Sequence, residues 1–250
     1  MLSMAKRIAL VTGASSGIGT AIARRLAKDG YAVMVAGRDA TRTETLVKEL
    51  PGARAWIGEL ATSADCDRLI ADCVKTFGGL DLLVNNAGIY LPAKAEETTD
   101  ATWNETLATN LSVPFFLCRA ALPHLRKSRG AIVNIASNWG LHGGANAVAY
   151  CASKGGLVLM TKALTVDHAA EGIRINAVCP GDVATPMLFR DAEARGLDRE
   201  AVLRESAATT RSGRVTTPEE VAGLVAYLAS DEAAQVNGAA ILMDGGSAAG

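Results

Sequence analysis

The sequence predicts an α/β protein in which a doubly wound parallel sheet of about seven strands carries helices on both faces. Two observations support this prediction. Short apolar runs with the length of buried strands alternate with longer segments of helical periodicity along the whole chain. The first of these runs leads directly into a glycine-rich stretch and then into a helical segment. Strands that alternate with helices form βαβ units, and such units build parallel sheets.

Seven apolar runs have the length and residue content of buried strands. They are Ile8–Val11, Tyr31–Ala36, Ala53–Gly58, Asp81–Val84, Ala131–Ala136, Arg174–Val178 and Ala239–Met243. Amphipathic segments lie between them, and the first of these ends at Gly30, a residue type that commonly terminates helices. No linker, repeat or low-complexity tract divides the chain, so we expect one domain over residues 1–250.

One interval, from about residue 182 to residue 217, interrupts the regular alternation of strands and helices. Long intervals of this kind in compact α/β domains are usually lids or binding loops. Within it, the segment from Met187 to Ala208 mixes apolar residues with many charges, as in a short amphipathic helix pair. We therefore expect a mobile lid that orders over bound substrate.

The composition is that of a compact globular protein. Of 250 residues, 49% are hydrophobic and 20% are charged, and the formal net charge of -1 gives no reason to expect nucleic acid or an anionic membrane as partner. The five cysteines are scattered without paired spacing, which favours reduced thiols in a cytoplasmic protein. The three histidines share no metal-ligand spacing, so no metal site is expected.

The stretch TGASSGIG, from Thr12 to Gly19, follows the first predicted strand. In doubly wound sheets this position binds phosphate, because glycines let the backbone approach the ligand and the next helix presents unpaired N–H groups. Glycines at 13, 17 and 19 fit neither GxGxxG nor the phosphate-binding loop that ends in lysine. On its own the stretch is compatible with either a phosphate site or a tight turn.

Further motifs follow the glycine loop in a fixed order: NNAG at 85–88, then Ser137, Tyr150 and Lys154, then Pro180 and Gly181 with Thr185 after them. This ordered set closely resembles the short-chain dehydrogenase/reductase family in its single-domain form, and the resemblance covers the whole chain. It implies a seven-stranded Rossmann-type sheet, a nicotinamide cofactor, a small-molecule substrate and commonly a homotetramer.

Tyr150 and Lys154 stand four residues apart in a segment predicted to be helical, so both side chains share one face. Oxidising an alcohol, or reducing a ketone, requires an acid/base beside the reacting oxygen. A free tyrosine has a pKa of about 10, and we expect the Lys154 ammonium to lower it by charge attraction. Ser137 follows a predicted strand at its carboxyl end, where its hydroxyl can donate to the substrate oxygen.

The resemblance implies further roles within this catalytic group. Lys154 also hydrogen-bonds the nicotinamide ribose. Asn110 matches the family's fourth catalytic residue, which holds a water that relays protons to the lysine. The substrate contacts are expected at Ser137, Trp139, His142, Tyr150 and Met187, although Trp139 and His142 could equally be packing residues at the pocket rim.

The motifs and the resemblance together assign a cofactor site. It consists of Gly13, Ser15, Ser16, Gly17, Ile18, Gly19, Arg38, Glu59, Leu60, Asn86, Ala87, Gly88, Tyr150, Lys154, Pro180, Gly181, Val183 and Thr185. By resemblance, residues 86–88 line the adenosine and ribose side, and Val183 and Thr185 bond the nicotinamide carboxamide. Glu59 and Leu60 stand where the family often has Asp and an apolar residue near the adenine.

The sequence after the second strand favours NADP(H), with NAD(H) as the alternative. An acidic side chain just off this strand usually accepts from the ribose hydroxyls of NAD(H), but Gly37 has no carboxylate. Arg38 follows, and a guanidinium there can pair with a 2′-phosphate. Asp39 argues for NAD(H), and Ser15 and Ser16 supply no second basic residue, so the preference is expected to be modest.

The predicted function is an oxidoreductase that transfers a hydride between a nicotinamide cofactor and a carbonyl or secondary alcohol. The alternative is a nucleotide-binding sensor or scaffold that kept the fold and lost turnover. Such a protein would be expected to lack one of Asn110, Ser137, Tyr150 and Lys154, and all four are present. The identity of the substrate stays open at this stage.

Overall fold

Seven parallel strands form one sheet in the computed structural model, which describes residues 6–249. In chain order they are β1 (Ile8–Thr12), β2 (Ala32–Gly37), β3 (Arg54–Ile57), β4 (Leu82–Asn85), β5 (Ala131–Ile135), β6 (Arg174–Pro180) and β7 (Ala240–Met243). Their order across the sheet is β3-β2-β1-β4-β5-β6-β7. Each strand begins and ends within two residues of the run predicted from the sequence, so the predicted fold class is confirmed.

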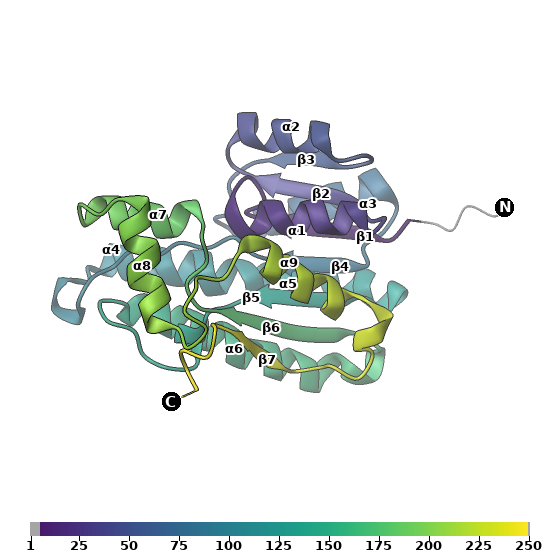
Figure 1. The fold of residues 1–250 in the computed structure, drawn as a ribbon. Helices are drawn as coiled ribbons and strands as arrows, with labels where there is room; N and C mark the ends of the chain where they lie inside the picture. The colour runs from purple at the N-terminus through teal and green to yellow at the C-terminus, as the bar shows by residue number, and fades with distance from the viewer. Residues whose placement is uncertain (1–5, 250) are drawn as a thin grey trace.

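Helices follow the strands and cover both faces of the sheet (Figure 1). They are α1 (Gly17–Lys28), α2 (Ala40–Glu49), α3 (Ser63–Phe77), α4 (Asp100–Leu107), α5 (Val113–Ser128), α6 (Val148–His168), α7 (Pro186–Ala194), α8 (Arg199–Thr209) and α9 (Pro218–Ala229). A π-helical turn, Ala108–Ser112, lies between α4 and α5. After α1 the chain turns at Gly30, whose φ of +91° explains the glycine predicted to end this helix.

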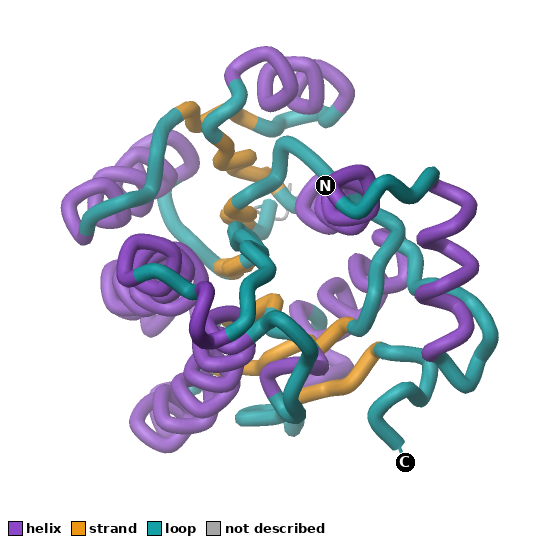
Figure 2. Tube along the Cα trace, turned by 90° about the vertical axis from the view of Figure 1, so that its left-hand side faces the viewer, coloured by secondary structure: helices purple, strands orange, loops and turns teal. Residues whose placement is uncertain are grey.

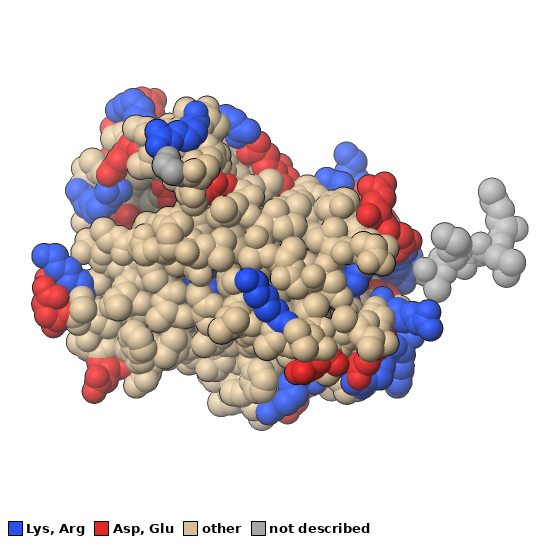
Figure 3. All heavy atoms as spheres, turned by 90° about the horizontal axis from the view of Figure 1, so that it is seen from below, with Lys and Arg blue, Asp and Glu red and all other residues tan. Residues whose placement is uncertain are grey.

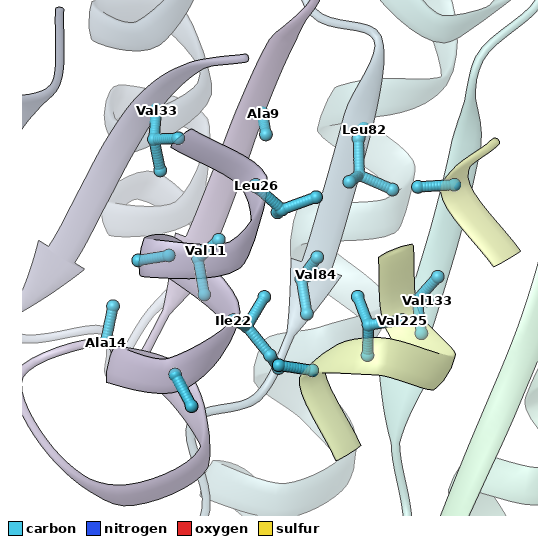
Figure 4. Packing of buried hydrophobic residues seen from close by; sticks show 14 of the residues in the cluster. Ala9, Val11, Ala14, Ile22, Leu26, Val33, Leu82, Val84, Val133 and Val225 are labelled. Atoms are coloured by element: carbon cyan, nitrogen blue, oxygen red, sulfur yellow. The ribbon is translucent and has the colours of Figure 1, made fainter. Parts of the chain in front are cut away.

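One hydrophobic core fills the space between the sheet and helices α1 and α9. Ile22 and Leu26 of α1 and Val225 of α9 are 0 to 1% exposed and pack on Val11 and Val84 of the central strands (Figure 4). These positions on α1 are four residues apart, the spacing that gives a helix one apolar face.

A second core lies on the opposite face, beneath α3 and α5. Leu69 of α3 and Leu117 of α5 are buried there against Leu10, Leu83 and Ile132 of the sheet. Alternate residues of one strand thus enter different cores, because successive side chains point to opposite faces. This explains why the strands are predominantly apolar and do not alternate apolar with polar residues: helices cover the sheet on both sides.

The two halves of the sheet diverge between β1 and β4. From β1 the chain adds β2 and β3 on one side, and then crosses to β4 and continues through β7 on the other. In such sheets ligands bind at this divergence, beyond the carboxyl ends of the strands. Figure 2 views the molecule from the side toward which the strand arrows of Figure 1 point, with helices on both sides of the strands.

The interval at 182–217 holds α7 and α8, so the helix pair predicted there is confirmed. Both helices lie at the edge of the molecule that the strand arrows reach (Figure 1). The two ends of the interval are joined to each other by an isolated bridge between Val183 and Thr216. Its predicted mobility stays a prediction. Within residues 6–249, no helix is both long and apolar enough to cross a membrane.

Candidate active site

A cleft of about 1280 Å³ runs along the carboxyl edge of the sheet. Its lining includes every residue predicted to bind cofactor or substrate, with two exceptions, Gly19 and His142. Among the four predicted catalytic residues, Ser137, Tyr150 and Lys154 line the cleft and Asn110 lies behind its wall. The volume exceeds the ~300 to 1,000 Å³ of pockets for a single drug-sized ligand, which leaves room for a dinucleotide and a substrate together.

The glycine loop forms one end of this cleft. Gly13 and Gly17 have φ values of +61° and +56°, a left-handed conformation that favours glycine. Gly19 lies behind the loop: a Cβ atom there would meet the oxygen of Gly13 and the amide of Asn86. Gly19 therefore acts through packing, because its missing side chain lets α1 approach the loop.

The beginning of α1 is suited to an anion. The side chain of Ser16, the N-cap residue, makes no capping hydrogen bond, and the first turn of α1 contains no acidic residue. The first N–H groups of the helix therefore have no side-chain acceptor from its cap, and they form the positive end of the helix dipole. These features fit the phosphates of a dinucleotide.

Asn86 and Thr12 hold the glycine loop against the end of β4. The Asn86 amide donates to the backbone oxygens of Thr12 and Gly13 at 2.9 and 3.1 Å. The Thr12 hydroxyl accepts from the backbone N–H groups of Asn86 and Ala87 at 3.0 and 3.1 Å. The side chain of Asn86 thus positions the loop, in addition to lining the cleft as predicted.

The charged residues after β2 are arranged around the start of α2. Asp39 caps this helix, because its carboxylate accepts from the backbone N–H of Arg42 at 2.9 Å and pairs with the Arg42 guanidinium at 3.2 Å. Arg38 and Arg42 are both exposed and line the cleft. Arg42 is a second basic residue that the sequence analysis did not assign to the site, because its approach to the cleft depends on the turn between β2 and α2.

Gly37 has no space for a side chain. It is the last residue of β2, whereas the sequence suggested that it is the first residue after this strand. A Cβ at Gly37 would lie 2.7 Å from the hydroxyl oxygen of Thr43 and 3.2 Å from the Cβ of Ser15. The missing carboxylate at this position therefore has a packing cause.

Tyr150 and Lys154 lie in the first two turns of α6 and both line the cleft. The Lys154 amine lies 5.7 Å from the centre of the Tyr150 ring, so the predicted common face is confirmed. Lys154 is 4% exposed and donates to the backbone oxygen of Ile135 at 2.8 Å. An ammonium has three N–H donors, so two remain for a ligand in the cleft.

Burial decides the protonation of both groups. It lowers the pKa of Lys154 to about 8 and raises the pKa of Tyr150 to about 12, where a hydrogen bond from Ser137 acts against it. The prediction that Lys154 lowers the pKa of Tyr150 is therefore wrong for this structure. The cost of placing a phenolate in this buried position is the largest effect, and the amine is directed toward the oxygen of Ile135.

Ser137 lies two residues after the end of β5 and is 7% exposed. Its hydroxyl accepts from the backbone N–H of Trp139 at 3.1 Å and donates to the side-chain oxygen of Asn138 at 3.3 Å. The first of these bonds caps the short helical turn that carries Trp139. The turn thus fixes the serine beside Tyr150.

Asn110 is fully buried in the π-helical turn. Its amide makes a pair of hydrogen bonds with the backbone of Ile89: the side-chain oxygen accepts from the N–H and the side-chain nitrogen donates to the carbonyl, both at 2.9 Å. The nitrogen also donates to the hydroxyl of Ser153 at 3.1 Å. The side chain of Asn110 therefore supports the loop that follows β4.

The remaining predicted contacts are distributed around the far half of the cleft. Met187 lies on α7, and Thr185 at the start of that helix packs where a Cβ of Gly17 would lie. Val183 is buried and forms the isolated bridge with Thr216. His142 is exposed outside the cleft, with its ring nitrogen 3.0 Å from the oxygen of Gly143. This position does not favour the predicted substrate contact of His142.

Besides Arg42, two further parts of the site were not predicted from the sequence. One is Tyr90, which lies in the cleft with its ring centre 5.2 Å from that of Tyr150. The other is a set of charges on α7 and α8, where Arg195 pairs with Asp191 at 3.2 Å and with Glu205 at 3.0 Å. An aromatic residue two positions after NNAG was a visible signal for Tyr90. No local pattern predicts which side of α7 meets the cleft.

The residues present fit a nicotinamide dinucleotide. The glycine loop offers free N–H groups at one end of the cleft, and the buried Lys154 amine has donors without a protein acceptor at the other. Within the part of the chain that the structure describes, no group of three His, Cys, Asp or Glu side chains could hold a metal ion.

A doubly wound parallel sheet with this glycine loop, and with Ser, Tyr and Lys around the other end of one cleft, defines a dinucleotide-binding oxidoreductase. The sequence model described as short chain dehydrogenase matches residues 7–196. The chain belongs to this family, and it is an oxidoreductase that transfers a hydride between a nicotinamide cofactor and an alcohol or carbonyl group.

Relatives cover nearly the whole chain. L-fucose dehydrogenase of Bos taurus is 37% identical over 98% of this chain and 91% of its own length. Meso-2,3-butanediol dehydrogenase of Serratia marcescens is 36% identical over 97% of this chain and 95% of its own. The crystal structure of a variant actinorhodin polyketide ketoreductase with NADPH superposes with a TM-score of 0.93 at 38% identity, covering 99% of both chains.

Proposed function

We propose that this oxidoreductase uses Tyr150 as its acid/base, Asn110, Ser137 and Lys154 as its other catalytic residues, and NADP(H) as its preferred cofactor. The observation that carries the proposal is the convergence of Ser137, Tyr150 and Lys154 at one end of a cleft whose other end is the glycine loop. The cofactor, when bound, supplies or accepts the hydride.

The protonation of Tyr150 suits proton donation. With a pKa raised to about 12 by burial, the phenol is neutral at pH 7 and can donate its proton to the oxygen of a ketone as that oxygen gains charge. The Ser137 hydroxyl, next to the phenol, can stabilise the same oxygen by a hydrogen bond. The Lys154 amine supplies hydrogen-bond donors deeper in the cleft and orients what binds beside the phenol.

The test of the reaction is the variant Tyr150→Phe, which removes the phenol and little else. We expect turnover to fall by at least ~10²-fold, while the dissociation constant for NADPH, measured by fluorescence titration, stays nearly unchanged. Lys154→Ala should impair both cofactor affinity and rate. Wild-type turnover in Tyr150→Phe on a confirmed substrate would contradict the mechanism. A protein that binds cofactor but turns over no ketone or polyol in a broad panel would favour the sensor alternative.

The preference for NADP(H) is supported by how charge is distributed after β2. The carboxylate of Asp39 is occupied by the cap of α2 and by the Arg42 guanidinium. Arg38 and Arg42 offer two exposed guanidinium groups at the cleft, and a phosphate on the ribose can pair with them. No carboxylate fits at Gly37, where one could accept from ribose hydroxyls.

Steady-state kinetics with NADPH and NADH test this preference. In wild type, kcat/KM should be higher with NADPH. Arg38→Ala should lower kcat/KM for NADPH about tenfold or more and change that for NADH little, because charge-assisted hydrogen bonds each contribute ~1.5 to 3 kcal/mol. Arg24→Ala, which changes an arginine of α1 that pairs with Glu49 outside the cleft, is the matched control. A wild type that strongly prefers NADH would overturn the assignment.

We also propose a homo-oligomer, a tetramer by family resemblance, formed through the face of α6 and β7. Val166 and Leu159 of α6 are 83% and 68% exposed, and Leu242 of β7 is 42% exposed. The face of the molecule seen from below shows a broad area with few charged side chains (Figure 3). Val166→Glu should lower the mass measured by light scattering, whereas Ile57→Glu, on the opposite edge strand, should not. A monomeric wild type would refute this proposal.

A further inference from the structure

Tyr90 lies where three aromatic rings meet in the cleft. Its ring centre is 5.2 Å from that of Tyr150 and 5.8 Å from that of Trp139, and Trp139 and Tyr150 are 6.2 Å apart. All three pairs meet edge to face, with interplanar angles of 65 to 84°. Because no ring lies flat on another, ring surface remains to line the cleft, and all three residues do so.

The backbone around Tyr90 is held on both sides. The preceding residue, Ile89, is fixed by the two hydrogen bonds of the buried Asn110 amide. Three residues later, the backbone N–H of Ala93 donates to the oxygen of Asn146 at 2.8 Å. Asn146 itself has a φ of +54°, an uncommon conformation for a residue other than glycine. This arrangement holds the backbone that carries Tyr90 in place beside the cleft.

Trp139 is fixed as well. A Cβ atom on Gly144 would lie within 2.5 to 2.9 Å of three atoms of the indole ring, so the loop backbone packs directly on that ring. Helix α7 also lines the cleft, to which it contributes the apolar Met187 and Leu188 together with Arg190 and Asp191. The cleft near Tyr150 is therefore lined by aromatic rings and by a mixed apolar and charged segment.

We propose that Tyr90 is a specificity-determining residue and that the preferred substrate is an alicyclic secondary alcohol or its ketone. The flat C–H face of a saturated ring can lie on the aromatic wall of Tyr90 and Trp139 while its reacting oxygen meets Tyr150. An open chain of the same size has no such face, and it loses more conformational freedom on binding. This inference rests on the proposed role of Tyr150 as acid/base.

The experiment compares two ketones of equal carbon number, cyclohexanone and 3-hexanone, in wild type and variants. Wild type should reduce cyclohexanone with the higher kcat/KM. Tyr90→Leu should lower that value about tenfold, mainly through KM, and change the value for 3-hexanone less than threefold. Tyr90→Phe, which keeps the ring, should stay within about twofold of wild type for both. Tyr227→Leu, on α9 outside the cleft, is the matched control.

Two further measurements separate this inference from the proposed reaction. An unchanged NADPH dissociation constant in Tyr90→Leu shows that the cofactor half of the site is intact. Calorimetric titration of the holoenzyme with cyclohexanol and 3-hexanol measures ring preference without turnover. If cyclohexanol binds more tightly than 3-hexanol, if this difference depends on Tyr90, and if no substrate is turned over, the proposed reaction is refuted and the inference about Tyr90 stands. The inference is overturned if the enzyme turns over both ketones and Tyr90→Leu either lowers kcat/KM equally for both or changes it for neither.

Discussion

The buried amine of Lys154 should make the free protein less stable at neutral pH. Lys154 is 4% exposed and has one protein acceptor, the oxygen of Ile135, and burial lowers its pKa from 10.5 to about 8. That difference corresponds to about 3 kcal/mol of unfavourable free energy in the native state while the amine is charged. We expect the cofactor-free protein to carry this cost because Lys154 is placed to meet a ligand.

The pH dependence follows from which state loses its proton first. Below about pH 8 both the native and the unfolded protein hold the proton of Lys154, and the full cost applies. As the pH rises from about 8 toward 10.5, the native state releases its proton first, so Lys154 destabilises the protein less. Between pH 7 and pH 9 the cost should fall by about 1 kcal/mol.

The variant Lys154→Met keeps the length of the side chain and removes the charge. It also leaves the oxygen of Ile135 without its donor, a loss of ~1 to 3 kcal/mol that does not depend on pH. Urea unfolding of the cofactor-free proteins, at equal protein concentration and at pH 7, 8 and 9, should therefore show that the stability of the variant relative to wild type declines by about 1 kcal/mol over this range. A difference that stays constant would refute the reasoning.

Lys162→Met provides the matched control for this experiment, because Lys162 is an exposed lysine two turns further along α6. It removes the same charge from the same helix without removing a buried amine. Its stability relative to wild type should not change by more than a few tenths of a kcal/mol between pH 7 and pH 9. A slope equal to that of Lys154→Met would assign the effect to the net charge of the protein.

Three further predictions concern the cleft. Gly19→Ala should lower NADPH affinity at least tenfold in a fluorescence titration, because its methyl group would push α1 away from the glycine loop; unchanged affinity would contradict the packing argument. Gly37→Asp should destabilise the protein by ~1 to 3 kcal/mol in urea unfolding, because its Cβ meets the Thr43 hydroxyl; a fully stable variant that now prefers NADH would contradict this. Hydrogen exchange in residues 187–208 should slow when cofactor and substrate bind, and equal, strong protection in every state would exclude a mobile lid.

The architecture was predictable from local sequence patterns. Runs such as Ile8–Val11 and Ala131–Ala136 are short and predominantly apolar, as is typical of strands in a sheet covered on both faces. The strands therefore fall within two residues of their predicted positions. The convergence of the glycine loop with Ser137, Tyr150 and Lys154 also follows from the sequence, because the carboxyl ends of parallel strands share one edge.

The sequence alone determined which chemical groups the protein possesses and the order in which the strands and helices present them. The tertiary structure decided what each group does there. Burial raised the pKa of Tyr150 and lowered that of Lys154, the reverse of the predicted effect on the tyrosine, because desolvation depends on all the surrounding elements. The contact of Tyr90 with Tyr150 joins residues 60 positions apart. Periodicity and motif spacing report only neighbours along the chain, and these contacts exist only once the sheet and helices pack.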